Sequence, residues 1–147
     1  MNKAQTLEAI EHAKAAHEAQ MIKIQDLLDG LKVSNPPESA KTKCAFGLWF
    51  HDDSNKVKEI LGAQFYDKID KLHSTWHVEY LRIFEIFFSN KRKGFFSKII
   101  GSSKVEDMEL DKAKLYYSEL LKTTDELLKV LEVSRRRVSA LSDSKFS

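Results

Sequence analysis

The chain has 147 residues, and 42% of them are hydrophobic, which is enough to bury the core of one ordinary domain. Its 24 basic and 22 acidic side chains leave a net charge of +2, which is too small to indicate nucleic-acid binding by itself. With five glycines and two prolines, few positions interrupt regular structure, so the composition favours long helices over short strands.

No stretch of the sequence approaches the roughly 20 consecutive apolar residues that a membrane-spanning helix needs. The N-terminus is polar and lacks the apolar core of a signal peptide, so we expect a cytoplasmic protein. The one cysteine, Cys44, cannot form an internal disulfide. In a reducing compartment it is a buried small side chain, a reactive thiol or a metal ligand.

The first predicted helix covers residues 6–32. Its apolar residues recur at steps of three, four or multiples of seven, as in an amphipathic helix: Leu7, Ile10, Met21, Ile24, Leu28 and Leu31. His17 lies seven residues from both Ile10 and Ile24, so we expect it on the buried stripe. His12 lies off that line and should face solvent. The two prolines that follow end this helix.

Further segments follow in chain order. Residues 39–50 are rich in aromatics and contain Cys44, and residues 51–55 are predicted to form a loop that caps a helical turn at 56–61. A helix over 63–90 carries a broad apolar stripe: Phe65, Ile69, Leu72, Trp76, Tyr80, Ile83 and Phe87. A basic linker, 91–106, leads to a final helix over 107–141 with heptad-like apolar spacing. We predict one all-α domain over 1–147, an antiparallel four-helix bundle with an additional short helix that carries Cys44.

Four residues form a candidate metal site. His73 and His77 are four residues apart on one predicted helix, so their imidazoles lie on the same face. Together with His17 and Cys44 they make a set of one thiolate and three imidazoles, which suits tetrahedral zinc. A pair of histidines at this spacing is weak evidence alone, because a histidine on an apolar face is more often a core residue. A lone cysteine is usually buried packing.

The sequence resembles the chemoreceptor zinc-binding domain family over about residues 10–90. Three motifs carry the resemblance: Ala16-His17, Cys44-Ala45-Phe46-Gly47-Leu48-Trp49 and His73-Ser74-Thr75-Trp76-His77. It implies that His17, Cys44, His73 and His77 are the zinc ligands. The family often has an aromatic residue three or four positions after the first histidine, where this chain has Gln20 and Met21. This departure makes His12 the alternative first ligand, although the heptad spacing favours His17.

The resemblance also implies a function. Proteins of this family are expected to regulate chemotaxis receptors and diguanylate cyclases by sensing zinc or oxidants such as hypochlorous acid. They are also expected to form homodimers. Four protein ligands would close the coordination sphere of zinc, so we expect no enzyme activity. Cys44 is the redox-sensitive ligand in this hypothesis. Asp70, three residues before His73, is the candidate to orient an imidazole, and His51 is expected at the surface.

Other interpretations stay open. In the linker, basic residues flank bulky apolar ones, as on a membrane-binding or partner-binding surface: Lys91, Arg92, Lys93, Lys98, Lys104, Phe95, Phe96, Ile99 and Ile100. We favour the interpretation that the apolar residues fold back onto the bundle. A di-iron bundle is disfavoured because Glu11, Glu18 and Glu79 do not align with the histidines. A bundle without metal, or an interaction bundle with purely structural zinc, is the remaining alternative.

Overall fold

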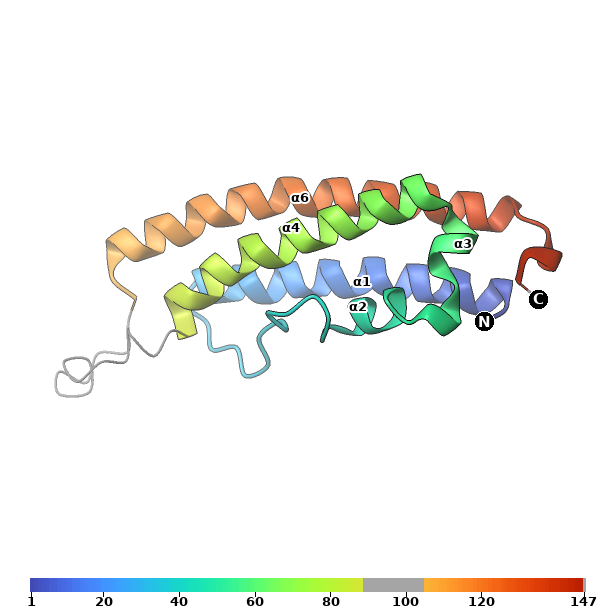
Figure 1. Cartoon of the computed structure of the whole chain (residues 1–147). Coiled ribbons are helices and arrows are strands. Elements are labelled where there is room, and N and C mark those ends of the chain that lie inside the picture. Colours follow the sequence, from blue (N-terminus) through green and yellow to red (C-terminus); the bar gives the residue numbers. More distant parts are fainter. Residues whose placement is uncertain (89–104, 147) are drawn as a thin grey trace.

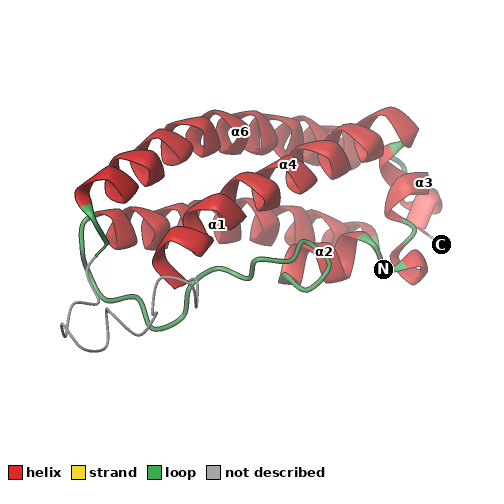
Figure 2. Cartoon of the chain, turned by 60° about the vertical axis from the view of Figure 1, so that its left-hand side comes forward, coloured by secondary structure: helices red, strands yellow, loops and turns green. Residues whose placement is uncertain are grey.

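The computed structural model describes residues 1–88 and 105–146, and every regular element in these two ranges is helical (Figure 2). The helices are α1 (Lys3–Leu28), α2 (Ala45–Phe50), α3 (Val57–Leu61), α4 (Ala63–Phe88) and α6 (Asp107–Ala140). Two 3₁₀ turns, η1 (Asp53–Asn55) and η2 (Asp143–Phe146), complete the described elements. The predicted all-α bundle is confirmed. The basic linker lies almost entirely in residues 89–104, outside the described part, as do its predicted roles.

Three long helices form the frame of the bundle (Figure 1). Helices α1 and α4 run in the same direction, and α6 runs back against both of them. The return from α1 to α4 is made by residues 29–62, which carry α2 beside α1 and α3 at the end of the bundle against α4 and α6. Within the described residues this segment, and not a long helix, occupies the fourth side of the bundle. Successive parts of the chain therefore alternate in direction, and the predicted short helix at Cys44 is α2.

Helix α1 begins and ends at clear local signals. Asn2 caps its start, because the Asn2 side chain accepts a hydrogen bond from the Gln5 N–H at 2.8 Å while the Gln5 side chain accepts from the Asn2 N–H at 2.9 Å. The helix ends at Leu28, before Gly30, whose φ of +80° lies in the left-handed region. It is thus shifted towards the N-terminus relative to the predicted range of 6–32.

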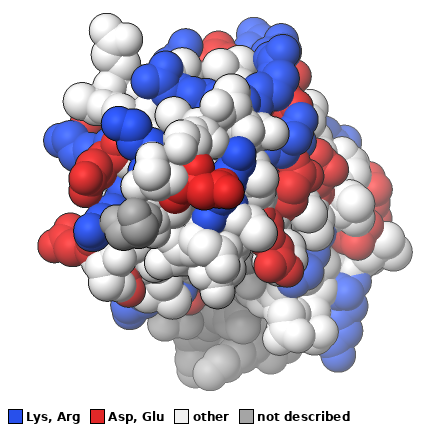
Figure 3. Space-filling model, turned by 90° about the vertical axis from the view of Figure 1, so that its right-hand side faces the viewer, with Lys and Arg blue, Asp and Glu red and all other residues white. Residues whose placement is uncertain are grey.

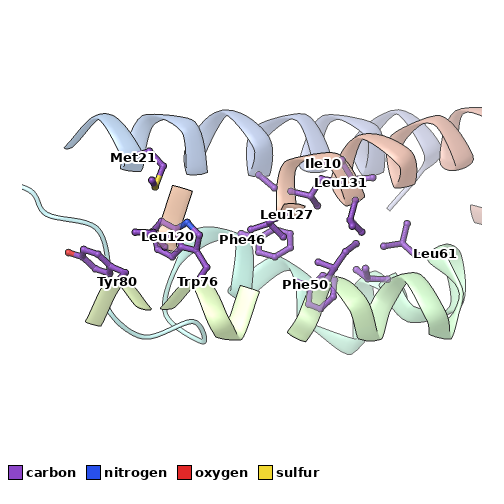
Figure 4. Packing of buried hydrophobic residues seen from close by; sticks show 14 of the residues in the cluster. Ile10, Met21, Phe46, Phe50, Leu61, Trp76, Tyr80, Leu120, Leu127 and Leu131 are labelled. Carbon is purple, nitrogen blue, oxygen red and sulfur yellow. The ribbon is translucent and has the colours of Figure 1, made fainter. Parts of the chain in front are cut away.

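Most of the predicted apolar stripes of the long helices meet in one core (Figure 4), but Leu28 packs in a second, smaller cluster and Leu31 is exposed beyond the end of α1. The largest fully buried side chains include Trp76 and Tyr80 of α4, Leu120 and Leu127 of α6, and Ile10 of α1. They come from positions spaced by three, four or seven residues, as an inward-facing helix stripe requires. Side chains of α1 and α4 meet in this core at the level of the predicted metal ligands, where the His17 ring lies 5.4 Å from that of His73.

The surface of the bundle carries both signs of charge. On the end that holds α3 and both termini, basic and acidic side chains are interspersed (Figure 3). This mixture agrees with the small net charge of +2. None of the described helices combines the length and the apolar character that crossing a membrane would require.

Candidate metal centre

Three buried histidines converge between α1 and α4. His17 comes from α1, and His73 and His77 come from successive turns of α4. Their exposed fractions are 4%, 0% and 5%. One ring nitrogen from each lies within 4.8 Å of the others, so the described residues contain a three-histidine cluster that can hold a metal ion. The predicted position of His17 on the buried stripe of α1 is confirmed.

The environment keeps these imidazoles neutral. Burial, together with smaller contributions from the nearby His77 and His17 rings, lowers the pKa of His73 to about 2. Burial also lowers the pKa of His77, to about 4, and it lowers the pKa of His17. A neutral imidazole has a free nitrogen lone pair, which is the form that binds a metal. At neutral pH the cluster is therefore in its metal-binding state.

Cys44 lies at the edge of this cluster. It is the N-cap of α2, where its Sγ accepts a hydrogen bond from the Gly47 N–H at 3.2 Å. The same Sγ lies 3.3 Å from Nε2 of His73. Burial raises the pKa of the Cys44 thiol, so the metal-free side chain is a thiol at neutral pH. It donates to the Lys41 carbonyl at 3.3 Å.

Gly47 has a steric reason to be glycine. A Cβ at this position would overlap the backbone carbonyl of Lys41 and would stand 3.3 Å from the Cys44 Sγ. The turn before α2 is thus folded tightly against the first turn of the helix. Only glycine leaves room for this turn, which holds the sulfur in place beside His73.

Backbone carbonyls orient two of the three rings. Nδ1 of His17 lies 2.7 Å from the Ala13 carbonyl oxygen, and Nδ1 of His77 lies 3.1 Å from that of Ser39. With Nδ1 as the donor in each case, both Nε2 atoms keep a free lone pair. Nε2 of His77 lies 3.0 Å from Nε2 of His73. Nδ1 of His73 is buried with no hydrogen-bond partner among the described residues.

Two of these separations are close to those of a tetrahedral zinc site, although the group of ligand atoms that all lie within 4.8 Å of one another contains the three histidines and not Cys44. Bonds of about 2.0–2.1 Å to nitrogen and about 2.3 Å to sulfur put two ligand nitrogens roughly 3.3 Å apart, and nitrogen and sulfur roughly 3.5 Å apart. The observed separations are 3.0 Å between the two Nε2 atoms and 3.3 Å between Sγ and Nε2 of His73. At this distance either a proton on one of the two Nε2 atoms or a cation between them can join the His73 and His77 rings. The chemistry of the donor set therefore suits a zinc ion.

Asp70 takes a different position from the one expected. Its Oδ1 accepts a hydrogen bond from the Lys41 ammonium at 3.2 Å and lies 3.4 Å from Nε2 of His51. Lys41 also donates to the Ser74 hydroxyl at 2.6 Å. This polar group fastens the turn before Cys44 to α4. His51 is half-buried in this group, not fully at the surface as predicted.

His12, the alternative first ligand, and Glu79, a carboxylate considered for a di-iron site, both lie outside the histidine cluster. His12 is exposed, and its Nε2 lies 3.9 Å from a Glu8 carboxylate oxygen. Glu79 accepts hydrogen bonds from the Thr123 hydroxyl of α6. No carboxylate of the described residues belongs to the histidine cluster, so the di-iron alternative has no support there.

The segment between α1 and α2 contributes contacts that side-chain motifs do not reveal. The Pro37 carbonyl accepts a hydrogen bond from the Tyr80 hydroxyl at 2.9 Å. Two residues later the Ser39 carbonyl meets His77, and two residues further the Lys41 carbonyl meets Cys44. We call residues 37–41 the strap. Every residue has a backbone carbonyl, so the sequence does not mark the contacts that the strap makes. The two prolines, Pro36 and Pro37, indicate only that the chain is not helical there.

Residues 17–83 match the family model of the chemoreceptor zinc-binding domain. The match begins at His17 and contains Cys44, His73 and His77, whereas α6 lies outside it. The resemblance inferred from the three motifs is thereby confirmed, and this part of the chain is similar to a zinc-binding family. No curated protein and no solved structure matched the chain.

Proposed function

We propose, from the match of residues 17–83 to a zinc-binding family and from the geometry of the cluster, that His17, Cys44, His73 and His77 hold one Zn²⁺. The observation that carries the proposal is the convergence of the three buried imidazoles, with the Cys44 sulfur 3.3 Å from Nε2 of His73. Bound zinc would hold Cys44 as its thiolate, the reactive form of the side chain.

The site is proposed to serve sensing and not catalysis. Four protein ligands leave no open position for a substrate or a water molecule. The ligands come from α1, from the start of α2 and from α4, so occupancy of the site is coupled to the packing of these three segments. Such coupling lets zinc availability change the structure around the strap.

Cys44 is where an oxidant would act in this proposal. Oxidation of its sulfur to a sulfenic acid removes the negative charge that makes it a zinc ligand. The Gly47 N–H and the Lys41 carbonyl would then face a changed partner, and the turn before α2 would loosen. We propose that this change is read in the cytoplasm by a signalling partner, such as a chemoreceptor or a diguanylate cyclase, and that the chain acts as a homodimer.

Zinc content and affinity test the ligand assignment. We expect about one zinc per chain by elemental analysis, and a Cys44→Ser variant should lose affinity by more than the roughly 10–100-fold that follows removal of a group that only orients a ligand. Serine keeps an acceptor for the Gly47 N–H, so α2 stays capped. A His12→Ala variant is the matched control and should bind like the parent. Full affinity in Cys44→Ser would overturn the assignment.

A second measurement separates a sensor from a purely structural site. Sub-stoichiometric hypochlorous acid should release zinc in proportion to the oxidation of Cys44, followed with a chromogenic zinc indicator. Zinc that stays bound while Cys44 becomes oxidised would contradict the redox proposal and favour a structural ion. The single cysteine makes the correlation direct, because no other thiol competes.

A further inference from the structure

The Lys41 side chain joins the last residue of the strap to α4. Its ammonium donates to Oδ1 of Asp70 at 3.2 Å and to the Ser74 hydroxyl at 2.6 Å. These two partners lie three positions before and one position after His73, so the ammonium spans the turn of α4 that carries this histidine. Lys41, Asp70 and Ser74 are all half-buried, where solvent screens an ion pair less than it does on an open surface.

The backbone of Lys41 is bonded to Cys44. Its carbonyl accepts a hydrogen bond from the Cys44 thiol at 3.3 Å. One residue earlier, the Ala40 carbonyl accepts from the N–H groups of Lys43 and Cys44 at 3.1 and 3.2 Å. The turn from Ala40 to Cys44 is thus closed on itself, and the Lys41 side chain fastens it to α4 beside His73.

We propose that Lys41 is a positioning residue for Cys44: its ammonium, held by Asp70 and Ser74, sets the separation between the Cys44 sulfur and Nε2 of His73. The inference rests on the proposed zinc site for its role in metal binding, whereas the fastening of the turn is a property of the metal-free chain.

Cys44 needs such a contact more than the histidines do. The three imidazoles project from two helices of 26 residues each, and these helices pack in the core. Cys44 instead precedes a helix of six residues. A helix this short has little stability of its own, because few hydrogen bonds offset the cost of nucleation. The position of the sulfur therefore depends on contacts such as that of Lys41.

The charge of Lys41 acts in the opposite direction. A cation near a zinc site repels the ion, and removal of Lys41 also leaves the Asp70 carboxylate without this cation. By charge alone, a Lys41→Met variant would bind zinc more tightly. A positioning role predicts weaker binding, because the turn no longer holds the sulfur beside His73. The direction of the change separates the two effects.

Zinc affinity of lysine variants tests the proposal. Lys41→Met should lower the affinity about 10-fold, within the roughly 10–100-fold range for groups that orient a ligand. Lys41→Arg keeps a cation that can reach Asp70 and should recover most of the loss. The matched control is Lys43→Met, which removes the same charge from an exposed lysine of the same turn and should not weaken binding. Unchanged or tighter binding in Lys41→Met, or equal weakening in Lys43→Met, would overturn the proposal.

A double-mutant cycle shows whether Lys41 acts through the sulfur. In a Cys44→Ser background, Lys41→Met should weaken binding by less than about 2-fold, because the group that it positions is gone. A loss of about 10-fold that persists in this background would mean that Lys41 supports the histidines or the fold in general, and it would contradict the proposal.

Cobalt in place of zinc gives a spectroscopic measure of the same bond. The chain has one cysteine, so sulfur-to-cobalt charge-transfer absorption reports on Cys44 alone. At saturating cobalt this band should weaken in Lys41→Met and keep its parent intensity in Lys43→Met. A band of full intensity in Lys41→Met would show that the sulfur reaches the metal without Lys41, against the proposal.

Amide hydrogen exchange tests the fastening of the turn without metal. The N–H groups of Lys43 and Cys44 donate to the Ala40 carbonyl, and that of Gly47 donates to the Cys44 sulfur. In Lys41→Met these amides should exchange several-fold faster, while the central amides of α4 keep their parent rates. Equal exchange in the variant and the parent would overturn the fastening. Faster exchange in a chain whose parent binds no zinc would overturn the ligand assignment instead, so the two failures are distinguishable.

Discussion

Nδ1 of His77 lies 3.1 Å from the carbonyl oxygen of Ser39, a residue 38 positions earlier in the chain. A side chain of the metal cluster is thereby bonded to the strap, which has no regular secondary structure of its own. One turn further along α4, the Tyr80 hydroxyl bonds the Pro37 carbonyl in the same way. Two adjacent turns of α4 thus hold the strap beside the cluster.

Removal of the Tyr80 hydroxyl should loosen the strap without touching a proposed ligand. A Tyr80→Phe variant leaves the buried Pro37 carbonyl without its partner, so we expect a loss of about 1–3 kcal/mol in the free energy of unfolding. Zinc affinity should fall by a smaller factor than in Cys44→Ser. Denaturant unfolding and zinc titration measure the two effects. An affinity loss as large as that of Cys44→Ser would contradict this order.

A Gly47→Ala variant should distort the turn that holds Cys44. The added Cβ would overlap the Lys41 carbonyl, so the backbone must move, at a cost of about 1–3 kcal/mol in stability. Zinc binding should weaken with it. Gly30→Ala is the comparison, because a Cβ there meets nothing within 4 Å although its φ is positive. That variant should lose stability but bind zinc normally in a titration against a competing chelator.

Acid should destabilise the metal-free chain through the buried histidines. The pKa values of His73 and His77, about 2 and about 4, lie below the ordinary value of 6.5 that they regain on unfolding. The unfolded state therefore binds more protons as the pH falls from 6.5, and stability decreases with slopes of up to about 1.4 kcal/mol per pH unit for each group.

Denaturant midpoints measured between pH 7 and pH 4 check this dependence. A His77→Phe variant removes one of the buried groups and should show a shallower decline. A parent protein whose midpoint is constant over this range would contradict the assignment of these pKa values to buried neutral rings.

Trp76 should report on the cluster optically. Its ring lies 5.2 Å from that of His17 and 4.9 Å from that of His77, measured between centroids. Ordering of these rings by zinc should change Trp76 emission, and a Trp49→Phe background isolates the signal because the chain has two tryptophans. In that background, zinc binding shown by elemental analysis without any change in emission would contradict the expected contact.

The indole of Trp76 also connects the cluster to α6. Its Nε1 donates to the Thr124 hydroxyl at 2.9 Å, and both groups are buried. Thr124→Val should therefore cost about 1–3 kcal/mol in unfolding free energy, because a buried donor is left without a partner. Thr123→Val removes only a half-buried bond to Glu79 and should cost less. Denaturant unfolding of the two variants compares them.

Periodicity was sufficient to predict the parts of the site that belong to long helices. His17 is buried because it is in register with Ile10 and Ile24, and such register is visible in the sequence. The strap was not predictable, because its contacts are made by backbone carbonyls that any residue possesses. The contact of Asp70 with Lys41 was missed for a related reason, since it joins residues 29 positions apart in different elements.

The start of α1 shows a signal that was present and overlooked. Asn2 followed by Gln5 forms a capping box, which moves the helix start to Lys3. The steric need for Gly47 could not be read from its neighbours, because the obstacle is a carbonyl six residues earlier in a turn of unpredictable shape. Sequence pattern thus predicted the helices and the buried histidines on them, while turn geometry decided how Cys44 approaches those histidines.

The wide spacing of the proposed ligands along the chain has a consequence for the denatured state. Cys44 and His73 are 29 residues apart, and His17 lies on a third segment still further from His73. An ion that joins all three closes two long loops at once, and the entropy of loop closure rises only slowly with loop length. Retention of zinc by the unfolded chain would therefore restrict its conformations as a pair of crosslinks does. Refolding in the presence of the metal should then begin from an ensemble in which both helices and the intervening segment are already close together.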